Sequence, residues 1–557
     1  MKKEMTMEMR LLLAFLLMGL VIFGTQYFYK PPPQPIPVPV AAKKDVAPDQ
    51  SNPAQAAVQA AVPAAEMPGQ IQSGAEETVT VDTDLYHVTF SNRGAVVRSW
   101  MLKAYKDRQG KPLELVNQKA LDKVPAPLTL AFKNHPTQTD PNNALFHVDR
   151  QDGGLNLLFE YSDGRADFKK SFKFAQDSYL VEVNSQVTAN GVLVPHSLEW
   201  RGGFGDQTIT NPAASEHALY YDLAASKLVI NQVKEAKNGP VTSSGTYSFA
   251  GLEDNYFAGV FLPGSKSTVE MTTYSDQIPD AAGKEEARVG ASVGGDGLNI
   301  FSLYVGSKDI DLLRKVDPKL EQLVDWGWFG IIAKPLFLVL NWTADHVAHN
   351  YGWAIILVTV TINLILFPLR ISSLKSSKKM QALQPQIAAI NAKYKNLSLR
   401  DPKKAEQNQE VMELYKKHGV NPVGGCLPMV LQIPFLYAFY KVLSVTVEMR
   451  GASWLWVPDL TQPETLAIHI LPIILVISQF AQQKMTPNPG ADQSTQKMMM
   501  FMPLLFGYMF YFASAGLVLY WLTGNFVGII QQWLLNRGGP PPAVVDVKPT
   551  PKKKSRN

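Results

Sequence analysis

The chain has 557 residues, with 53 basic residues against 48 acidic ones and a formal net charge of +5. Only 18% of the residues are charged and 46% are hydrophobic, and apolar residues gather near the N-terminus and after Trp326, which excludes a purely soluble protein. The small net charge argues against a surface made for nucleic acid, and the single cysteine, Cys426, excludes a disulfide scaffold and a zinc cluster.

The first 77 residues predict a membrane anchor followed by a tether. Residues 11–29 form an apolar run of 19 residues, which at roughly 1.5 Å per residue just spans a hydrocarbon core of about 30 Å. No small-residue cleavage site follows it, so we expect residues 1–29 to be an uncleaved anchor. Residues 30–77 are rich in Pro, Ala and Gln, a composition that cannot build a core and predicts an extended tether.

Residues 78–325 predict one large antiparallel β domain. Short alternating runs, such as residues 78–81 (TVTV) and 86–90 (YHVTF), are separated by turn signals such as Asn92-Arg93-Gly94. Acidic residues outnumber basic ones here by 31 to 25, so the excess of positive charge lies elsewhere. We expect this domain on the outer side of the membrane.

Residues 326–349 predict an amphipathic helix in the membrane interface. Trp326, Trp328 and Trp342 stand beside Lys334 and Asp345, and tryptophan favours the level of the lipid headgroups. Five further apolar stretches have lengths that suit a membrane span: residues 351–369, 427–447, 466–481, 498–513 and 516–533. Together with the anchor they predict six spans.

The distribution of Lys and Arg predicts the orientation of these spans. Residues 370–418 carry 11 basic and 4 acidic residues and residues 537–557 carry 6 and 1, so both segments are expected in the cytoplasm. Residues 448–465 and 514–516 contain one basic residue between them, Arg450, and are expected outside. The predicted fold is therefore a polytopic α-helical membrane protein with both termini inside and a large external antiparallel β domain.

Three motifs in the apolar half carry a family resemblance. They are NPVGGCLP (421–428) followed by QIP (432–434), QKMTP (483–487), and GLVLYW (516–521) followed by Asn525, Gln531 and Gln532. Together they resemble the YidC/Oxa/Alb family of membrane protein insertases. The anchor, tether, β domain and basic tail resemble the long form of this family in Gram-negative bacteria.

The resemblance implies a function and a domain organisation. Such a protein inserts and folds integral membrane proteins into the bacterial inner membrane, alone or with the Sec translocon. The implied parts are a periplasmic β-supersandwich domain (78–325), the interfacial helix (326–349), a five-helix core (350–536) that includes a cytoplasmic helical hairpin (371–420), and a basic cytoplasmic tail (537–557). No cofactor and no metal are expected.

The resemblance also implies a polar groove between the helices, open to the cytoplasm and to lipid, into which substrate helices enter. Polar groups within spans are costly and usually face a bundle interior or a water cavity. The expected groove residues are Thr359, Asn363, Gln432, Trp521, Thr523 and Asn525. For any one of them, hydrogen bonding between helices is the alternative, and the sequence leaves it open.

Asn363 departs from the family pattern, which usually has an arginine four residues before the aromatic-proline-leucine step, here Phe367-Pro368-Leu369. The attraction of acidic substrate tails by this arginine is therefore in doubt. Arg370 follows Asn363 by seven residues, about 10 Å along a helix, and is expected at the cytoplasmic mouth of the groove. Lys441 is expected near the outer end of its span. Whether either replaces the missing arginine stays open.

The segment 371–420 predicts a hairpin with arms over residues 373–395 and 402–418. Lys375, Lys378 and Lys379 lie in the first arm, and with Arg370 they suit contact with ribosomal RNA or anionic lipid headgroups. A solvated face that only sets the topology is the alternative. The resemblance implies these partners: nascent membrane proteins, the Sec translocon and its accessory subunits, the ribosome, signal recognition targeting factors and the phospholipid bilayer.

Other classes of function have less support from the sequence. Neither an H-E-x-x-H motif nor a P-loop is present, and the chain is not predicted to be an enzyme. A membrane-anchored carbohydrate-binding protein stays open, because the implied β-supersandwich is similar to sugar mutarotase folds. Aromatic residues such as Trp100, Trp200 and Tyr221 are, however, mostly core in a β domain. A transporter is expected to have repeated halves, which the five C-terminal spans lack.

Overall fold

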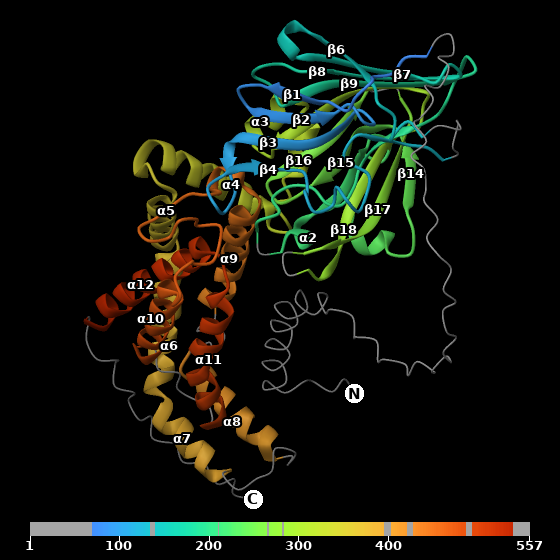
Figure 1. The fold of residues 1–557 in the computed structure, drawn as a ribbon. Coiled ribbons are helices and arrows are strands. Elements are labelled where there is room, and N and C mark those ends of the chain that lie inside the picture. Colours follow the sequence, from blue (N-terminus) through green and yellow to red (C-terminus); the bar gives the residue numbers. More distant parts are fainter. Residues whose placement is uncertain are drawn as a thin grey trace, which may run out of the picture.

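The structure is a computed structural model and describes residues 70–133, 140–209, 211–264, 267–280, 283–394, 403–419, 427–485 and 493–537. Figure 1 shows a large β domain at one end of the molecule and a group of helices that extends away from it. The predicted anchor at residues 1–29, nearly all of the tether, the motif at residues 421–426 and the tail from residue 538 lie outside the described residues.

The described part of the β domain forms three antiparallel sheets. The largest has the strand order β13-β12-β15-β16-β19-β9-β8-β7-β6, with β10 paired to β9; the other two have the orders β14-β17-β18-β11-β5 and β1-β2-β3-β4. The strands of the largest sheet are β6 His147–Gln151, β7 Asn156–Ser162, β8 Ala166–Lys173, β9 Leu180–Ala189, β10 Val192–Leu193, β12 His217–Asp222, β13 Lys227–Asn231, β15 Tyr247–Glu253, β16 Phe257–Pro263 and β19 Leu298–Ser307. The others are β1 Thr78–Asp82, β2 Tyr86–Ser91, β3 Val96–Lys106, β4 Pro112–Glu114, β5 Thr129–Ala131, β11 Ser197–Trp200, β14 Val241–Gly245, β17 Val269–Pro279 and β18 Glu285–Gly294.

The core of the β domain follows from the alternation in the sequence. In β8 every second residue, including Phe168 and Lys170, is buried, and the residues between them are exposed or half-buried. Rings from different sheets meet in this core, since the centroids of Trp100 in β3 and Trp200 in β11 lie 6.4 Å apart. The prediction that these two tryptophans are core residues is confirmed, and Tyr221 is half-buried.

Lys170 is a buried cation that joins two turns of this core. Its ammonium group donates hydrogen bonds to the carbonyl oxygens of Gly94, Ala95 and Leu128 at 2.8, 3.1 and 2.7 Å. All three residues have left-handed backbones, with φ of 73°, 48° and 67°, and their carbonyls converge on the ammonium group. Burial lowers the pKa of Lys170 to about 7. These hydrogen bonds link the turn between β2 and β3 to Leu128, the residue before β5.

The helices after the β domain lie below it in Figure 1, and the pair α7 and α8 lies at the far end. Their bounds are α3 Ile310–Val316, η3 Pro318–Leu323, α4 Gly330–Thr343, η4 Ala344–Ala348, α5 Tyr351–Ile365, α6 Phe367–Ala382, α7 Gln384–Lys393, α8 Lys403–Lys417, α9 Leu427–Val445, η6 Val447–Met449, α10 Ile470–Met485, α11 Gln493–Tyr511 and α12 Ala515–Arg537. Three short helices lie within the β domain: η1 Asp152–Gly154, α2 Pro212–Ser215 and η2 Val233–Ala236.

Each of the five apolar stretches after residue 350 contains a helix, but several boundaries differ from the prediction. The stretch 351–369 is divided, because α5 ends at Ile365 and α6 begins at Phe367 with Pro368 in its first turn, where a missing N–H donor costs nothing. Most of the stretch 498–513 lies in α11, which has 19 residues, begins at Gln493 and ends at Tyr511. The helix α10 begins at Ile470 and ends at Met485, four residues later at each end than the predicted stretch 466–481.

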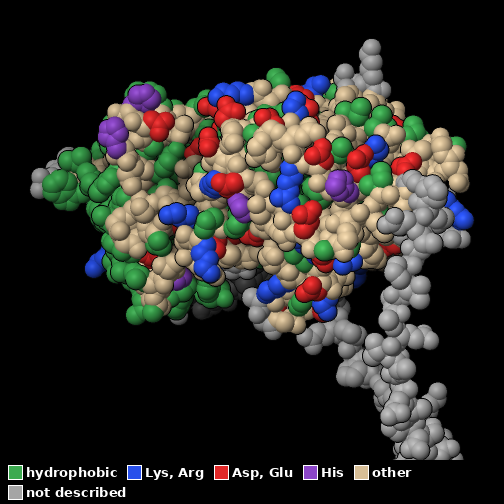
Figure 2. Space-filling view, turned by 45° about the horizontal axis from the view of Figure 1, so that its top comes forward, with side chains coloured by type: hydrophobic (Ala, Val, Ile, Leu, Met, Phe, Trp, Pro, Cys, Tyr) green, Lys and Arg blue, Asp and Glu red, His purple; other side chains and the backbone are tan. Residues whose placement is uncertain are grey.

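The predicted interfacial segment 326–349 forms α4 followed by the short π-helical turn η4. The helix α4 buries Leu336, Phe337 and Leu340 and packs on α5 and α9, whereas Trp328 and Ile331 are 95% and 86% exposed. Figure 2 shows apolar side chains concentrated on the helical side of the molecule and charged side chains scattered over the β domain. Large exposed apolar surfaces are typical of contact with lipid or with another protein.

None of the described helices is by itself long and apolar enough to cross a membrane. The segments 330–348 and 351–365 reach that length and apolarity only as a pair, and the chain bends by 115° between them.

Candidate functional site

The candidate site lies where α12 packs against α5, α9 and α10. The five polar residues expected in the groove are buried or half-buried in the structure: Thr359, Asn363, Gln432, Thr523 and Asn525. Thr361, by contrast, is exposed and donates its hydroxyl hydrogen to the Leu357 carbonyl one turn earlier at 2.9 Å. Thr361 therefore lies on the exposed face of α5, and Thr359 lies on its buried face.

Asn363 connects α5 to α12. Its Nδ2 donates to the Thr359 carbonyl at 2.8 Å, and its own backbone carbonyl accepts a hydrogen bond from Gln531 Nε2 at 3.3 Å. Thr359 is fully buried, Asn363 is 7% exposed and Gln531 is 4% exposed. Two of the polar atoms in this contact, Thr359 Oγ1 and Gln531 Oε1, have no hydrogen-bond partner in the described protein.

Arg370 of α6 reaches back to Asn363. Its Nη1 donates a hydrogen bond to Asn363 Oδ1 at 3.3 Å. A Cβ atom added to Gly528 of α12 would overlap the Arg370 guanidinium and the Gln482 amide of α10, so the glycine leaves room for both. The guanidinium therefore lies between α5, α10 and α12. The sequence left open whether Arg370 takes the place of an arginine at position 363, and in the structure its long side chain folds back far enough to reach Asn363.

The surroundings of Arg370 contain no acidic side chain from these helices. The sequences of α5, α6, α9, α10, α11 and α12 include neither Asp nor Glu. The hydrogen-bond acceptor that the described residues offer to Arg370 is a neutral amide. A guanidinium in such surroundings can bind an anion in bidentate fashion.

Two further contacts join α12 to its neighbours. Gln432 of α9 donates to the Tyr520 hydroxyl at 2.6 Å, and Asn525 of α12 donates to Ser478 Oγ of α10 at 2.9 Å. Thr523 donates to the carbonyl of its own helix at Leu519, at 2.8 Å. Gln432 and Asn525 thus make the contacts between helices that the sequence left open as an alternative.

Trp521 of α12 packs against α11. Its ring packs against Phe506 and Phe510 of α11, with centroid distances of 5.8 and 5.1 Å. Its neighbour Tyr520 instead stacks on Phe439 of α9 at 4.0 Å. The structure therefore does not bring Trp521 together with Thr359 and Asn363.

The basic residues expected at the cytoplasmic hairpin are only partly described. Lys379 is exposed near the end of α6, and the side chains of Lys375 and Lys378, although on the same helix, lie outside the described part. The hairpin itself is formed by α7 and α8, which pack through Leu383, Ile387 and Tyr415. The first arm starts as a continuation of the second predicted span and not as a separate helix at residue 373.

Lys441 contacts the β-domain side and not the groove. Its ammonium group pairs with Asp325 at 2.6 Å. The sequence missed two residues of the site, Tyr520 and Gln531. A signal for Gln531 was present, because Asn525, Gly528 and Gln531 recur every three residues and share one side of α12.

Comparisons with known proteins show which family the chain belongs to. A family model described as YidC periplasmic domain matches residues 78–339, and one described as 60Kd inner membrane protein matches residues 342–540. A solved structure described as an active YidC insertase with the first transmembrane domain resolved is 18% identical, with a TM-score of 0.36, and covers 83% of this chain and 93% of that one.

Two curated relatives are similar over nearly their whole length. The membrane protein insertase YidC of Ralstonia nicotianae is 34% identical over 92% of this chain and 93% of its own, and that of Geotalea daltonii is 32% identical over 96% and 100%. The two matched family models define the class, an inner membrane protein with a large periplasmic β domain. The chain belongs to the YidC family of membrane protein insertases. The prediction of an insertase that is not an enzyme is confirmed by this membership.

Proposed function

We propose that this insertase takes up apolar segments of nascent membrane proteins in a polar groove between α5, α9, α10 and α12, with Arg370 as the cation of the groove. The observation that carries the proposal is the position of the Arg370 guanidinium beside Asn363, among helices without an acidic residue. A cation in such surroundings costs free energy unless water solvates it or an anionic ligand binds to it. A carboxylate in the hydrophilic tail of a substrate is such a ligand.

Buried polar atoms support a hydrated groove. Thr359 Oγ1, Gln479 Oε1 and Gln531 Oε1 belong to α5, α10 and α12, and each is buried without a hydrogen-bond partner among the described residues. In a membrane, polar groups of this kind need water or the polar groups of a bound chain. The hydrogen bonds of Gln432 and Asn525 would then keep the helices at fixed positions while the groove holds the substrate.

The proposed topology has six spans, with both termini in the cytoplasm and the β domain in the periplasm. Figure 1 supports it, because the basic hairpin of α7 and α8 and the β domain lie at opposite ends of the helices. The proposed parts are the anchor (1–29), tether (30–77), periplasmic β-supersandwich (78–325), interfacial helix (326–349), five-helix core (350–536) and basic tail (537–557). Exposed apolar residues on the helices, such as Ile365, Ile477 and Tyr508, suit contact with lipid.

Two forces drive insertion in this proposal. Burial of the apolar substrate segment in lipid contributes about 25 cal/mol for each Å² removed from water. A carboxylate that crosses toward the positive outer side gains about 2.3 kcal/mol per 100 mV of membrane potential. Arg370 lowers the free-energy cost of removing the carboxylate from water, because the carboxylate contacts the guanidinium as it enters the groove.

The proposed partners act at the two ends. Arg370, Lys375, Lys378 and Lys379, at the mouth of the groove and on α6, suit the ribosome, the signal recognition targeting factors and the headgroups of the bilayer. The Sec translocon and its accessory subunits are proposed to meet the chain when longer substrates are inserted. Replacing Lys375, Lys378 and Lys379 with Gln should weaken co-sedimentation with ribosomes and reduce its dependence on salt.

The experiment that tests the groove compares substrates that differ only in their translocated tail. Arg370→Gln should slow insertion of a one-span protein with acidic residues in its tail, and it should leave the same protein with Asn and Gln in the tail nearly unchanged. Arg370→Lys should be intermediate, since it keeps the charge without the planar fork. Photo-crosslinkers at Thr359, Gln432 and Trp521 report on contact with the substrate. If no nascent chain reacts at Thr359 or Gln432 while insertion proceeds normally, the groove is misplaced.

A further inference from the structure

The outer loop, residues 446–469, joins α9 to α10 and contacts the ends of the other helices. Asn350, before α5, donates to a carbonyl of the loop at 2.7 Å. At α12, the backbone N–H groups of Ala515 and Gly516 donate to loop carbonyls, both at 2.8 Å. At α11, the ring of Tyr511 stacks on His469 of the loop at 4.1 Å. The outer loop therefore contacts five helices, each at the end that lies nearest the β domain.

A buried ion pair joins the β domain to this loop. Arg450 of the loop pairs with Asp206, in the segment between β11 and β12, and the two side chains are 9% and 0% exposed. The other carboxylate oxygen of Asp206 accepts hydrogen bonds from the backbone and the hydroxyl of Thr208 at 2.8 and 2.6 Å. The Arg450 guanidinium also lies over the Phe257 ring, 5.4 Å from its centroid.

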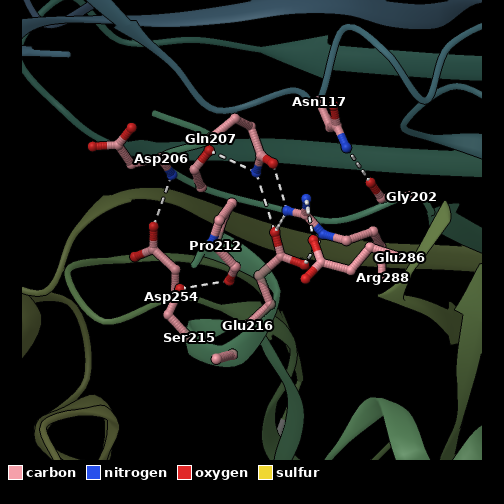
Figure 3. A network of polar contacts seen from close by, with 12 residues as sticks. Asn117, Gly202, Asp206, Gln207, Pro212, Ser215, Glu216, Asp254, Glu286 and Arg288 are labelled. Atoms are coloured by element: carbon pink, nitrogen blue, oxygen red, sulfur yellow. Dashed lines mark hydrogen bonds and ion pairs between the residues drawn. The ribbon is translucent and has the colours of Figure 1, made fainter. Parts of the chain in front are cut away.

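Asp206 is itself anchored in the β domain by a polar network, which Figure 3 shows. Its backbone N–H donates to Asp254 Oδ2 at 2.8 Å. The next residue, Gln207, donates to Glu216, and Glu216 accepts from Arg288 Nε of β18 at 3.0 Å. The segment that carries Asp206 is therefore fixed to the five-stranded sheet.

A second contact reaches the crossing of α9 and α12. Asp254 accepts a hydrogen bond from the backbone N–H of Tyr256 at 2.8 Å, and the Tyr256 hydroxyl donates to the carbonyl of Leu443 in α9 at 3.2 Å. Leu443 packs closely against Gly516 of α12, since a Cβ atom added to this glycine would overlap the Leu443 side chain. The network around Asp206 thus contacts both the outer loop and the helix crossing beneath it.

We propose that the pair Arg450–Asp206 is a positioning contact through which the β domain keeps the outer loop closed over the ends of α5, α9, α10, α11 and α12. In this role the β domain separates the polar interior of the helices from the outer solution. The inference goes beyond the proposed groove, since it assigns a task to the β domain and does not depend on which residues bind the substrate. Loss of one partner leaves a buried charge uncompensated, which makes opening of the loop far more favourable.

The experiment measures access from the outer side to a buried position of α9. Val442, which is fully buried, is changed to Cys in a full-length Cys426→Ser background. A membrane-impermeant maleimide is then added to the outer face of spheroplasts. Arg450→Gln and Asp206→Asn should each raise the rate of labelling by about a hundredfold, the population change that loss of a buried ion-pair partner produces. The double variant should be labelled no faster than either single variant, because the two residues act as one contact.

A matched control uses a more exposed pair between α9 and the β domain, Lys441–Asp325, whose side chains are 18% and 59% exposed. Asp325→Asn should therefore change the labelling rate by less than about threefold. Limited proteolysis of the β domain separates release of the loop from unfolding, and Asp206→Asn is the gentler variant because it keeps the acceptor for Thr208. The proposal is overturned if both single variants are labelled at the wild-type rate, or if proteolysis of the β domain rises in step with labelling. Labelling needs no substrate, so failure of the proposed groove would leave this result intact.

Discussion

Two glycines of α12 offer a matched test of the position of Arg370. A Cβ atom on Gly528 would overlap the guanidinium of Arg370, whereas a Cβ atom on Gly524 would meet only Gln432 Nε2, at 3.9 Å. Replacing either glycine with alanine improves the helix propensity of the same helix by about 1 kcal/mol. The two variants therefore differ mainly in whether Arg370 and the neighbouring neutral amide of Gln482 must move. We expect Gly528→Ala to slow insertion of substrates with acidic tails and Gly524→Ala to leave it unchanged.

The size of the effect follows from the displacement. The new methyl group requires the guanidinium to move by about 1 Å to reach ordinary van der Waals contact. At an effective dielectric constant of about 20, the attraction between unit charges falls from about 4 kcal/mol at 4 Å to about 3.3 kcal/mol at 5 Å. The difference, about 0.8 kcal/mol, corresponds to a factor of about four in rate.

The assay is insertion of a radiolabelled one-span protein into proteoliposomes that contain each variant, scored by protection of the translocated tail from protease. Rates are compared for an acidic tail and for its Asn/Gln counterpart. We expect the ratio of the acidic-tail insertion rate to the neutral-tail insertion rate to fall about fourfold in Gly528→Ala and to stay at the wild-type value in Gly524→Ala. Equal ratios in Gly528→Ala, Gly524→Ala and the wild type would refute the assignment of Arg370 to the groove.

Three further predictions concern stability and contacts of single residues. Burial lowers the pKa of His196 to about 4, below the value of about 6.5 for an unfolded histidine, so acidification from pH 6.5 to 4 protonates the unfolded chain first. The contribution of His196 to this loss of stability should reach about 3 kcal/mol in urea titrations. His196→Gln should remove that contribution and leave the one from His217, whose pKa burial also lowers to about 4. Lys170→Met leaves three buried carbonyl groups without their donor and should lower the free energy of unfolding by about 3 kcal/mol or more, measured in the same titrations. Tyr520→Phe removes the acceptor of Gln432 and should lower the melting temperature by only a few degrees, since one hydrogen bond contributes about 1 kcal/mol; a loss as large as that of Lys170→Met would contradict the assignment of a single contact.

The organisation of the chain was readable from its sequence because it depends on local patterns. Alternation over residues 78–307 predicts strands that bury one face, and the apolar stretches after residue 350 predict helices, without any knowledge of what each element packs against. Lys and Arg counts likewise predict an orientation from charge alone. Boundaries were less secure where a single residue decides them, as at Pro368, whose position in the first turn of α6 divides the second predicted span.

The candidate site was only partly readable. Thr359 and Asn363 were expected to be buried and are, because a polar residue in an apolar helix is costly on its lipid face. Which side of α12 faces which neighbour was not readable, so Trp521 was expected beside Thr359 although it packs on α11, and Tyr520 was missed. Adjacent residues of a helix point about 100° apart, and only the packing of the neighbours tells which of the two is inside.

The sequence by itself therefore determined the β domain, the places of the apolar helices and the membership in a family of insertases. The tertiary structure decided that Arg370 reaches Asn363 past Gly528, and that Arg450 meets Asp206, 244 residues away in the chain. Hydropathy and alternation are properties of a segment, since water acts on every side chain in the same way wherever it lies. The partner of a charge is a property of the fold, because an ion pair forms only where packing brings two particular side chains within a few ångströms of each other.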